Sequence, residues 1–324
     1  MSSLAVQETG SIETQEQGVD SLDAFKRKSR SDANSNIIWG SGFILLHAGL
    51  LVFGVIAFSD LFRSLFFIIG VAGLAAGLWE YYGSKKLTLV DLRNHNEAQT
   101  FTKSVEKSAI PYTTAILGCL IVVAVPEFIA GENESIQAAG LVKSAVWDGE
   151  VWRLLTCATL HVNFMHIWMN GQALVGLGRM IESLTNRAYL TIVFLPSAVC
   201  GSVFSLLLMP NTTSAGASGG LMGLVGFLAV LGYRRKEILP PGYFKSILMN
   251  ICFMGVIGLI GFAIIDNAAH LGGLLAGVVC GLILIKKDVN ADPAKVGMLV
   301  KGLGLASLLL IGLISFLSIV MIVR

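Results

Sequence analysis

Nine long apolar stretches constrain the fold of this chain more than any other feature of its 324 residues. They cover residues 37–58, 61–82, 110–130, 166–184, 188–209, 218–234, 244–265, 268–286 and 299–323. About 20 apolar residues in a helix cross the hydrocarbon core of a bilayer. Only 14% of the residues are charged, whereas about a quarter are charged in a soluble domain. The sequence therefore predicts an all-α, polytopic membrane protein, with 166–184 as its least regular span because Gln172, Arg179 and Glu182 interrupt it.

The basic residues fall in alternate connections between these stretches. Lys and Arg gather in the tail before residue 37, the loop 83–109, the turn after 184, the loop 235–243 and the segment after 285. The other connections are poorer in basic residues: 59–60, 131–165, 210–217 and 266–267. Because basic connections stay in the cytoplasm, we expect nine spans with a cytoplasmic N-terminus. An integral, multi-pass location in a bacterial plasma membrane fits this pattern.

The polar segments divide the chain further. We expect residues 1–36 to be a poorly ordered cytoplasmic tail, 37–82 a transmembrane hairpin and 83–109 a cytoplasmic linker. The connection 131–165 contains Trp147 and Trp152, which is typical of a segment lying in the membrane interface. The net charge is only +2 and no Lys/Arg run has interleaved aromatic residues, so no nucleic-acid partner is expected. The five cysteines form no CxxC pair and are interpreted as packing residues.

A serine and a histidine each stand at the start of a glycine-rich apolar stretch. Ser218 opens the stretch "SGGLMGLVG", and His270 precedes the glycines of "AHLGGLLAG". Small residues at four-residue spacing let two helix backbones approach closely. Such an approach would bring the Ser218 hydroxyl within reach of His270, as a base-activated nucleophile requires. Each motif alone is also typical of an ordinary helix interface in a membrane protein.

Three further polar residues lie at or just before the start of the stretch 166–184: His161, His166 and Asn170. His166 and Asn170 are four residues apart and therefore share one helix face, from which both can donate hydrogen bonds to a carbonyl oxygen. Polar contacts between helices are the alternative interpretation of this pair, and for His161 alone that alternative is favoured. Asp266 is four residues before His270 and would either orient it or cap its helix. "GASGG" fits the hydrolase pattern G-x-S-x-G, but the preceding apolar span excludes the hydrolase strand.

Four motifs in this order resemble those of the rhomboid family of intramembrane serine proteases. They are "EVWR" ending at Arg153, "HVNFMHIWMN" from His161 to Asn170, "GASG" around Ser218, and "AHLGGLLAG" with His270. The resemblance covers 110–286 and implies a protease core of six transmembrane helices. The span 299–323 is similar to the additional C-terminal helix of one subtype, whereas the hairpin 37–82 has no counterpart that we associate with the common bacterial form.

The resemblance also implies roles for individual residues. Ser218 would be the nucleophile and His270 the general base, and the oxyanion hole would comprise His166, Asn170 and the Ser218 backbone. The supporting residues would be His161, Gly216, Trp152 and Arg153, the last two stabilising the interfacial loop. Many members carry an aromatic residue where this chain has Met222. A thioether can also pack on an imidazole ring, so this departure does not predict inactivity.

The sequence thus predicts a serine endopeptidase that cleaves transmembrane segments of single-span membrane proteins, through an acyl-enzyme, at a site opening to the outer side. No metal or organic cofactor is expected. One alternative is a catalytically silent rhomboid-like protein that binds or escorts membrane clients, and the intact serine and histidine argue against it. A metal transporter using His161, His166 and His270 ranks last, because carboxylates are nearly absent from the outer halves of the spans.

Overall fold

The computed structural model describes residues 2–61, 64–262, 265–288 and 290–324, with side chains described from residue 19 onward in most of these ranges. Most of these residues are helical. The long helices are α1 (Ser2–Val52), α3 (Leu65–Ser84), α4 (Leu89–Glu106), α5 (Pro111–Ala130), α9 (Phe164–Leu184), α10 (Ala188–Leu208), α11 (Ser218–Arg234), α12 (Tyr243–Ile260), α13 (Asn267–Leu284) and α14 (Met298–Val323).

Shorter elements join them. They are α2 (Phe58–Leu61), α6 (Glu132–Ala139), α7 (Lys143–Trp147), α8 (Arg153–Thr156), and the 3₁₀ turns η1 (Cys157–Thr159) and η2 (Lys236–Ile238). Strands β1 (Leu141–Val142) and β2 (Thr213–Ser214) form a two-residue antiparallel pair, in which Leu141 faces Ser214. The fold is therefore all-α with one short strand pair, as the sequence predicts.

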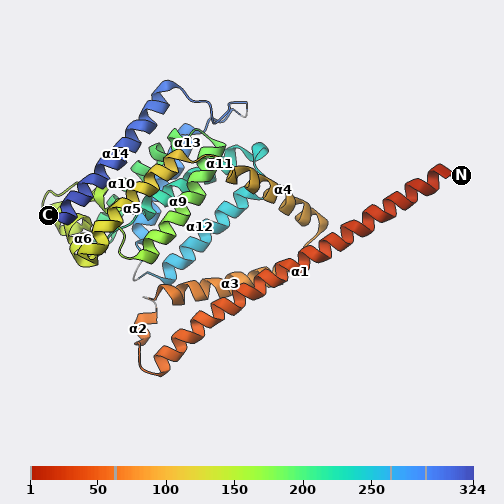
Figure 1. Cartoon of the computed structure of the whole chain (residues 1–324), viewed down its shortest axis with the longest axis horizontal. Coiled ribbons are helices and arrows are strands. Elements are labelled where there is room, and N and C mark those ends of the chain that lie inside the picture. The colour runs from red at the N-terminus through yellow and green to blue at the C-terminus, as the bar shows by residue number, and fades with distance from the viewer. Residues whose placement is uncertain (1, 62–63, 263–264, 289) are drawn as a thin grey trace. The chain divides into compact units, whose positions relative to one another are not determined.

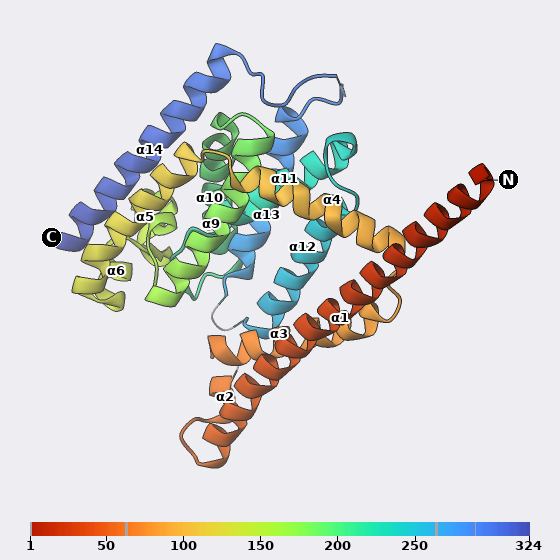
Figure 2. The same ribbon diagram turned by 45° about the vertical axis from the view of Figure 1, so that its right-hand side comes forward.

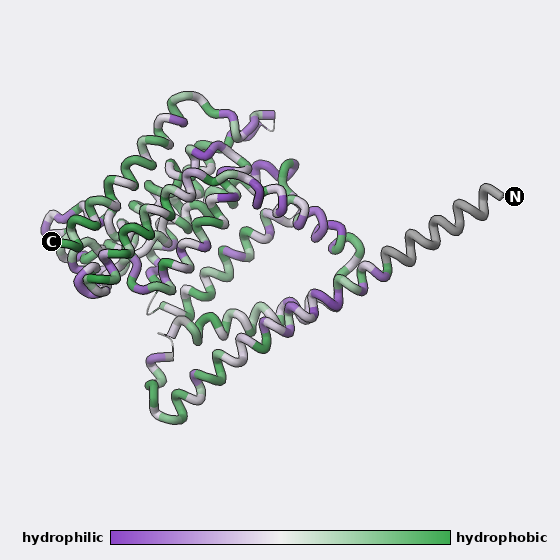
Figure 3. Tube along the Cα trace, in the orientation of Figure 1, coloured by the Kyte–Doolittle hydropathy of each residue, from purple (hydrophilic) through white to green (hydrophobic). Residues whose placement is uncertain are grey.

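Each of the nine predicted spans corresponds to a helix. Within the described residues, seven helices are long and apolar enough to cross a membrane: the part 19–52 of α1, most of α3, and all of α5, α10, α12, α13 and α14. Apolar residues dominate the long helices α5, α10 and α14 (Figure 3). The helix α9 is interrupted by polar residues, and α11 has only 17 residues. The chain is a polytopic membrane protein.

The polar N-terminal segment lies within a helix. α1 begins at Ser2 and continues without a break into the apolar stretch, ending at Val52; poor order over 1–36 stays a prediction. The segment contains no proline and many residues that favour helices, such as Ala, Gln, Glu, Lys and Arg. The predicted linker 83–109 is likewise mostly helical, because α4 occupies Leu89–Glu106.

The chain forms two compact units. The first contains residues 1–100 and 253–265, and the second contains residues 101–252 and 266–324. In the first unit, α1 and α3 form a hairpin in which Gly40 and Gly77 allow close backbone contact. His47 in α1 is buried, and its Nε2 lies 2.5 Å from the hydroxyl of Ser64, the N-cap of α3.

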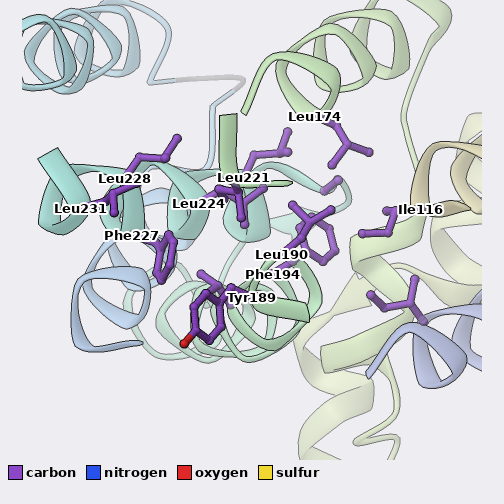
Figure 4. Close-up of a cluster of buried hydrophobic side chains, with 14 of the residues drawn as sticks. Ile116, Leu174, Tyr189, Leu190, Phe194, Leu221, Leu224, Phe227, Leu228 and Leu231 are labelled. Atoms are coloured by element: carbon purple, nitrogen blue, oxygen red, sulfur yellow. The ribbon is translucent and has the colours of Figure 1, made fainter. Parts of the chain in front are cut away.

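The second unit is a bundle in which α5, α9, α10, α11, α13 and α14 lie alongside one another (Figures 1 and 2). Helix α11 is buried along most of its length, as its place between α9, α10 and α13 requires. Figure 4 shows its apolar residues Leu221, Leu224 and Phe227 beside Leu190 and Phe194 of α10. This packing fixes the start of α11, where the candidate site lies.

Candidate active site

Ser218 is the first residue of α11 and lies half-buried at the end of the bundle. The first-turn N–H groups of a helix have no acceptor within the helix, so the backbone around Ser218 offers free donors. The N-cap, Ala217, makes no side-chain cap. A helix start of this kind favours negative charge, which is the property an oxyanion site needs.

Helices α11 and α13 pack backbone against backbone. A Cβ atom added at Gly273 would overlap the carbonyl oxygen of Gly219, and one added at Gly277 would overlap that of Gly223. Such contacts are possible only where both helices carry glycine at the crossing. The close approach brings the starts of the two helices together, with Ser218 on one and His270, in the first turn, on the other.

His270 has both a histidine and a carboxylate as neighbours. Its ring is close enough to His166 and to Asp266 for electrostatic interaction with each. Among the described residues, no hydrogen bond joins the Ser218 hydroxyl to the His270 ring. Catalytic hydrogen bonds are often long in a free enzyme and shorten when substrate binds, so this geometry is compatible with a nucleophile and its base.

His166 and Asn170 face the segment that leads into Ser218. A Cβ atom at Gly216 would lie 2.8 Å from His166 Cε1 and 3.7 Å from Asn170 Nδ2, so both side chains lie against this residue. Gly216 also has φ +139°, a conformation that residues with a Cβ rarely adopt. Glycine is thus required here by backbone conformation and by space, and it lets two hydrogen-bond donors approach within two residues of Ser218.

The two donor side chains are held differently. Asn163 caps α9 by accepting a hydrogen bond from the His166 N–H at 2.9 Å, which fixes the first turn of the helix. Asn170 is 7% exposed, and its Nδ2 has no hydrogen-bond partner. A buried amide without a partner is costly, and its N–H groups remain available to a ligand oxygen.

His161 lies in the segment between η1 and α9 and is fully buried. Its ring centroid is 5.1 Å from that of His166, with the planes at 72°. Its backbone N–H donates to Glu127 Oε1 of α5 at 2.7 Å. The Glu127 bond therefore holds the backbone of His161, and the His161 ring packs against His166. No hydrogen bond joins the described His161 ring to Ser218.

Arg153 and Trp152 belong to the segment between α5 and α9. Arg153 is buried and donates to the carbonyl oxygens of Gly140 and Gln137, both at 2.8 Å, and to Glu150 at 2.6 Å. These bonds tie α8 to the end of α6 and the start of β1. Trp152 is 37% exposed and precedes α8 as its N-cap. The geometry agrees with the expected role of Arg153 in stabilising this segment.

Asp266 caps α13; its backbone carbonyl accepts from the His270 N–H at 3.1 Å, but its carboxylate makes no hydrogen bond to the His270 ring. Its Oδ1 accepts from the Ala269 N–H at 2.9 Å, and its Oδ2 accepts from the hydroxyls of Ser205 and Ser214 at 2.5 and 2.6 Å. Of the two roles that the sequence left open, the structure shows the cap. Both oxygens are occupied, so the carboxylate orients the helix that carries His270 and not the ring itself.

A small cavity adjoins Ser218. Polar side chains form much of its wall: Ser202, Ser205, Ser214, Asp266 and Cys157. Lys143 is buried nearby and donates to Ser214 at 2.7 Å and to Thr212 at 3.2 Å. The segment 210–217 thus borders a polar cavity and is tied by hydrogen bonds to α7 and α13, so it is more than a loose turn.

Sequence reasoning did not identify two of these polar groups. Glu127 and Lys143 are both buried, at 2% and 3% exposure. Glu127 is the only acidic residue in its apolar stretch, and an ionisable residue within a membrane stretch is a candidate functional residue. This signal could have identified Glu127. Within the described residues, no group of three or more His, Cys, Asp or Glu side chains is arranged to hold a metal ion.

Comparison with known proteins agrees with this architecture. Residues 148–287 match the model of the rhomboid domain. The rhomboid protease GluP of Bacillus subtilis is 33% identical over 149 residues, which are 45% of this chain and 28% of that protein. The mitochondrial RHOMBOID-like protein 6 of Arabidopsis thaliana is 31% identical over 168 residues, which are 49% of this chain and 52% of that protein.

A third relative, the putative rhomboid protease YdcA of Bacillus subtilis, is 27% identical over 143 residues, which are 44% of this chain and 71% of that protein. The chain thus spans about a quarter to a half of the first two relatives and more of the third. The matched region contains Ser218 and His270 together with His166 and Asn170. This part of the chain is therefore similar to the rhomboid domain and to proteins named for it.

Proposed function

We propose that the chain is an intramembrane serine endopeptidase that cleaves transmembrane segments of single-span membrane proteins. The observation that carries this proposal is the meeting of α11 and α13 through glycine, with Ser218 and His270 at their adjacent starts. His166 and Asn170, both directed at Gly216, support it by offering donors beside the serine. The named rhomboid proteases among its relatives support the same reaction class.

In the proposed mechanism, His270 takes the proton from the Ser218 hydroxyl as the oxygen attacks the scissile carbonyl. The developing oxyanion is stabilised by Asn170, His166 and the free backbone N–H groups at the start of α11. His270 returns the proton to the leaving amine, and an acyl-enzyme remains on Ser218. Water, activated by the same histidine, then releases the second product.

The substrate follows from the position of the site at a helix end. A peptide bond within a regular helix has its carbonyl engaged, so it is a poor target until the helix unwinds. Small or helix-breaking residues near the cleavage site lower the cost of unwinding. We therefore expect single-span substrates with such residues near the outer end of the span, the side on which the distribution of basic residues predicts the site.

The test uses the full chain in liposomes with a model single-span substrate. Cleavage should require Ser218 and His270, so Ser218→Ala and His270→Ala should each abolish it. A fluorophosphonate probe should label the wild type and not Ser218→Ala. Ser64→Ala is the matched control, because Ser64 is a serine beside a histidine, His47, that has no part in the proposed site. This variant should keep both labelling and cleavage.

Cleavage that persists in Ser218→Ala would reject the proposal. A protein that binds single-span clients but neither cleaves them nor reacts with the probe would instead be the silent, client-binding alternative.

A further inference from the structure

The carboxyl group of Glu127 lies inside the bundle without a cationic partner. It belongs to the last turn of α5, one residue after Pro126, and is 2% exposed. Among the described residues, no Lys or Arg forms an ion pair with it. A buried carboxyl is costly, and those within membrane segments usually serve a purpose. The α5 packing does not need it, since every residue from Ala115 to Pro126 is apolar.

One oxygen of Glu127 is occupied by the backbone of the segment that precedes α9. Its Oε1 accepts the His161 N–H at 2.7 Å, a bond between residues 34 apart in the chain. The bond therefore anchors the backbone of His161 to α5, just three residues before α9 begins.

The side chains beyond this bond form a buried polar row that leads to the proposed oxyanion hole. The His161 ring packs edge-on against His166, with centroids 5.1 Å apart. His166 in turn lies against Gly216, two residues before Ser218. A displacement of the His161 backbone would therefore move the His161 ring and, through it, the ring of His166, a proposed oxyanion donor.

Several polar atoms in this row have no hydrogen-bond partner. They are Glu127 Oε2, both ring nitrogens of His161, and His166 Nδ1. The His161 ring has no side-chain partner. Its position depends on the backbone bond to Glu127, on packing, and on an interaction with the backbone of Thr159. The same segment is held at Thr159 by Ser318 of α14, at 2.9 Å between hydroxyl oxygens, but that contact does not involve His161.

We propose that Glu127 is a positioning residue for the oxyanion hole: through the His161 N–H it sets the His161 ring, and through that ring it sets His166. The inference rests on the proposed protease function. The required property is a hydrogen-bond acceptor at the place of Oε1. An amide supplies it as well as a carboxylate does, and its NH₂ group can face the unpartnered nitrogens of His161.

Three substitutions separate this role from simple packing. Glu127→Gln keeps the acceptor, Glu127→Leu keeps the approximate volume without it, and Glu127→Asp keeps the carboxyl group but withdraws the acceptor by one methylene. Glu134→Gln is the control, because Glu134 is an exposed carboxylate just beyond the end of α5. Each variant is reconstituted as the full chain, and kcat and KM for a single-span substrate are measured with the rate of fluorophosphonate labelling and the thermal midpoint.

Glu127→Gln and Glu134→Gln should retain wild-type turnover. Glu127→Leu and Glu127→Asp should lower kcat by up to about 10²-fold, the size of effect expected when a reacting group is misplaced by about 1 Å. KM should not change, and the labelling rate should fall with kcat. If Glu127→Leu fails to fold, Glu127→Asp decides, since it retains the carboxylate.

Wild-type kcat in a folded Glu127→Asp or Glu127→Leu protein would overturn the inference, and so would equal losses in Glu127→Gln and Glu127→Leu. These results leave the proposed function intact as long as cleavage still requires Ser218. Cleavage that does not require Ser218 would instead reject the proposed function itself.

Discussion

At the scale of single residues, Asn170 offers the sharpest test of the proposed chemistry. Its Nδ2 is buried, has no protein partner and lies beside Gly216. Removing one oxyanion donor from a serine hydrolase lowers kcat by about 10²–10³-fold. We expect Asn170→Ala to lower kcat in this range and to leave KM nearly unchanged, because the donor acts mainly on the transition state.

Gln172→Ala is the matched control for this measurement, since Gln172 is an exposed amide on the same helix. It should cleave the substrate like the wild type. An equal fall in both variants would show that α9 is merely sensitive to substitution, and unchanged kcat in Asn170→Ala would remove Asn170 from the oxyanion hole.

Lys143 leads to a prediction about pH. Burial lowers the pKa of its ammonium below the ordinary value, against the opposing effects of Asp266 and Cys157. The unfolded chain therefore binds more protons than the folded one between the two pKa values, and folding stability gained from this residue rises with pH in that window. Relative to Lys143→Met, the wild type should become more stable as the pH rises towards 10.5.

The measurement is the thermal midpoint of both proteins in detergent at several pH values from 7 upward. The hydrogen bonds to Ser214 and Thr212 do not oppose the trend, because a neutral amine still has two N–H donors. A difference between the two proteins that stays constant or shrinks with rising pH would contradict the prediction.

The residues of the site were predictable to different degrees. Four residues of the site belong to recognisable sequence motifs, and all four lie at one end of the bundle: Ser218, His270, His166 and Asn170. Glu127 and Lys143 belong to no such motif, and their importance depends on partners 34 and 71 residues away in the chain, which the sequence pattern cannot supply.

At the scale of helices, the crossing of α11 and α13 determines where the serine and histidine lie. Even a methyl group at Gly277 would overlap the backbone of Gly223. We expect Gly277→Ala to separate the helices, with a loss of stability of about 1–3 kcal/mol, as is typical of overpacking, and a loss of cleavage. The thermal midpoint and the cleavage rate of the reconstituted protein check both parts.

Gly118→Ala in α5 is the comparison, because a Cβ at Gly118 meets no atom within 4 Å. This change should keep activity and leave stability equal or higher, since alanine favours the helix by up to about 1 kcal/mol. Equal tolerance of alanine at Gly277 would show that the two helices do not depend on this close crossing.

The elements themselves were mostly predictable, because a span requires a long apolar run and little else. All nine runs are helical, and the irregular run at 166–184 is indeed one that falls short as a candidate span. The boundaries of the helices and the structure of the polar segments were harder to predict from the sequence. The strand pair β1–β2 joins residues 71 to 73 positions apart, and the continuous helix from Ser2 to Val52 depends on local propensity that the polar composition concealed.

At the scale of the whole molecule, glycine residues let two helices pack closely in each of the two compact units. In the first unit, Gly77 of α3 lies against the backbone of α1 near Ala33, and buried His47 joins the two helices through Ser64. In the second, glycine contacts between α11 and α13 hold the candidate site. The family match begins at residue 148, so the α1–α3 hairpin lies outside the matched domain.

The orientation of the whole chain follows from the distribution of Lys and Arg and can be tested without any assay of activity. The segments 210–217 and 287–297 are predicted to lie on opposite sides of the membrane, the first outside and the second in the cytoplasm. Asn211 and Ala294 are exposed residues in these two segments.

In intact cells, a membrane-impermeant maleimide should label Asn211→Cys and not Ala294→Cys, whereas both should react after the membrane is opened. The parent chain, with its five native cysteines, gives the background signal. If only Ala294→Cys is labelled in intact cells, the orientation is the reverse of the predicted one and Ser218 lies on the cytoplasmic side. If both are labelled, an even number of spans must lie between residues 211 and 294, and the three helices α11, α12 and α13 cannot all cross the membrane.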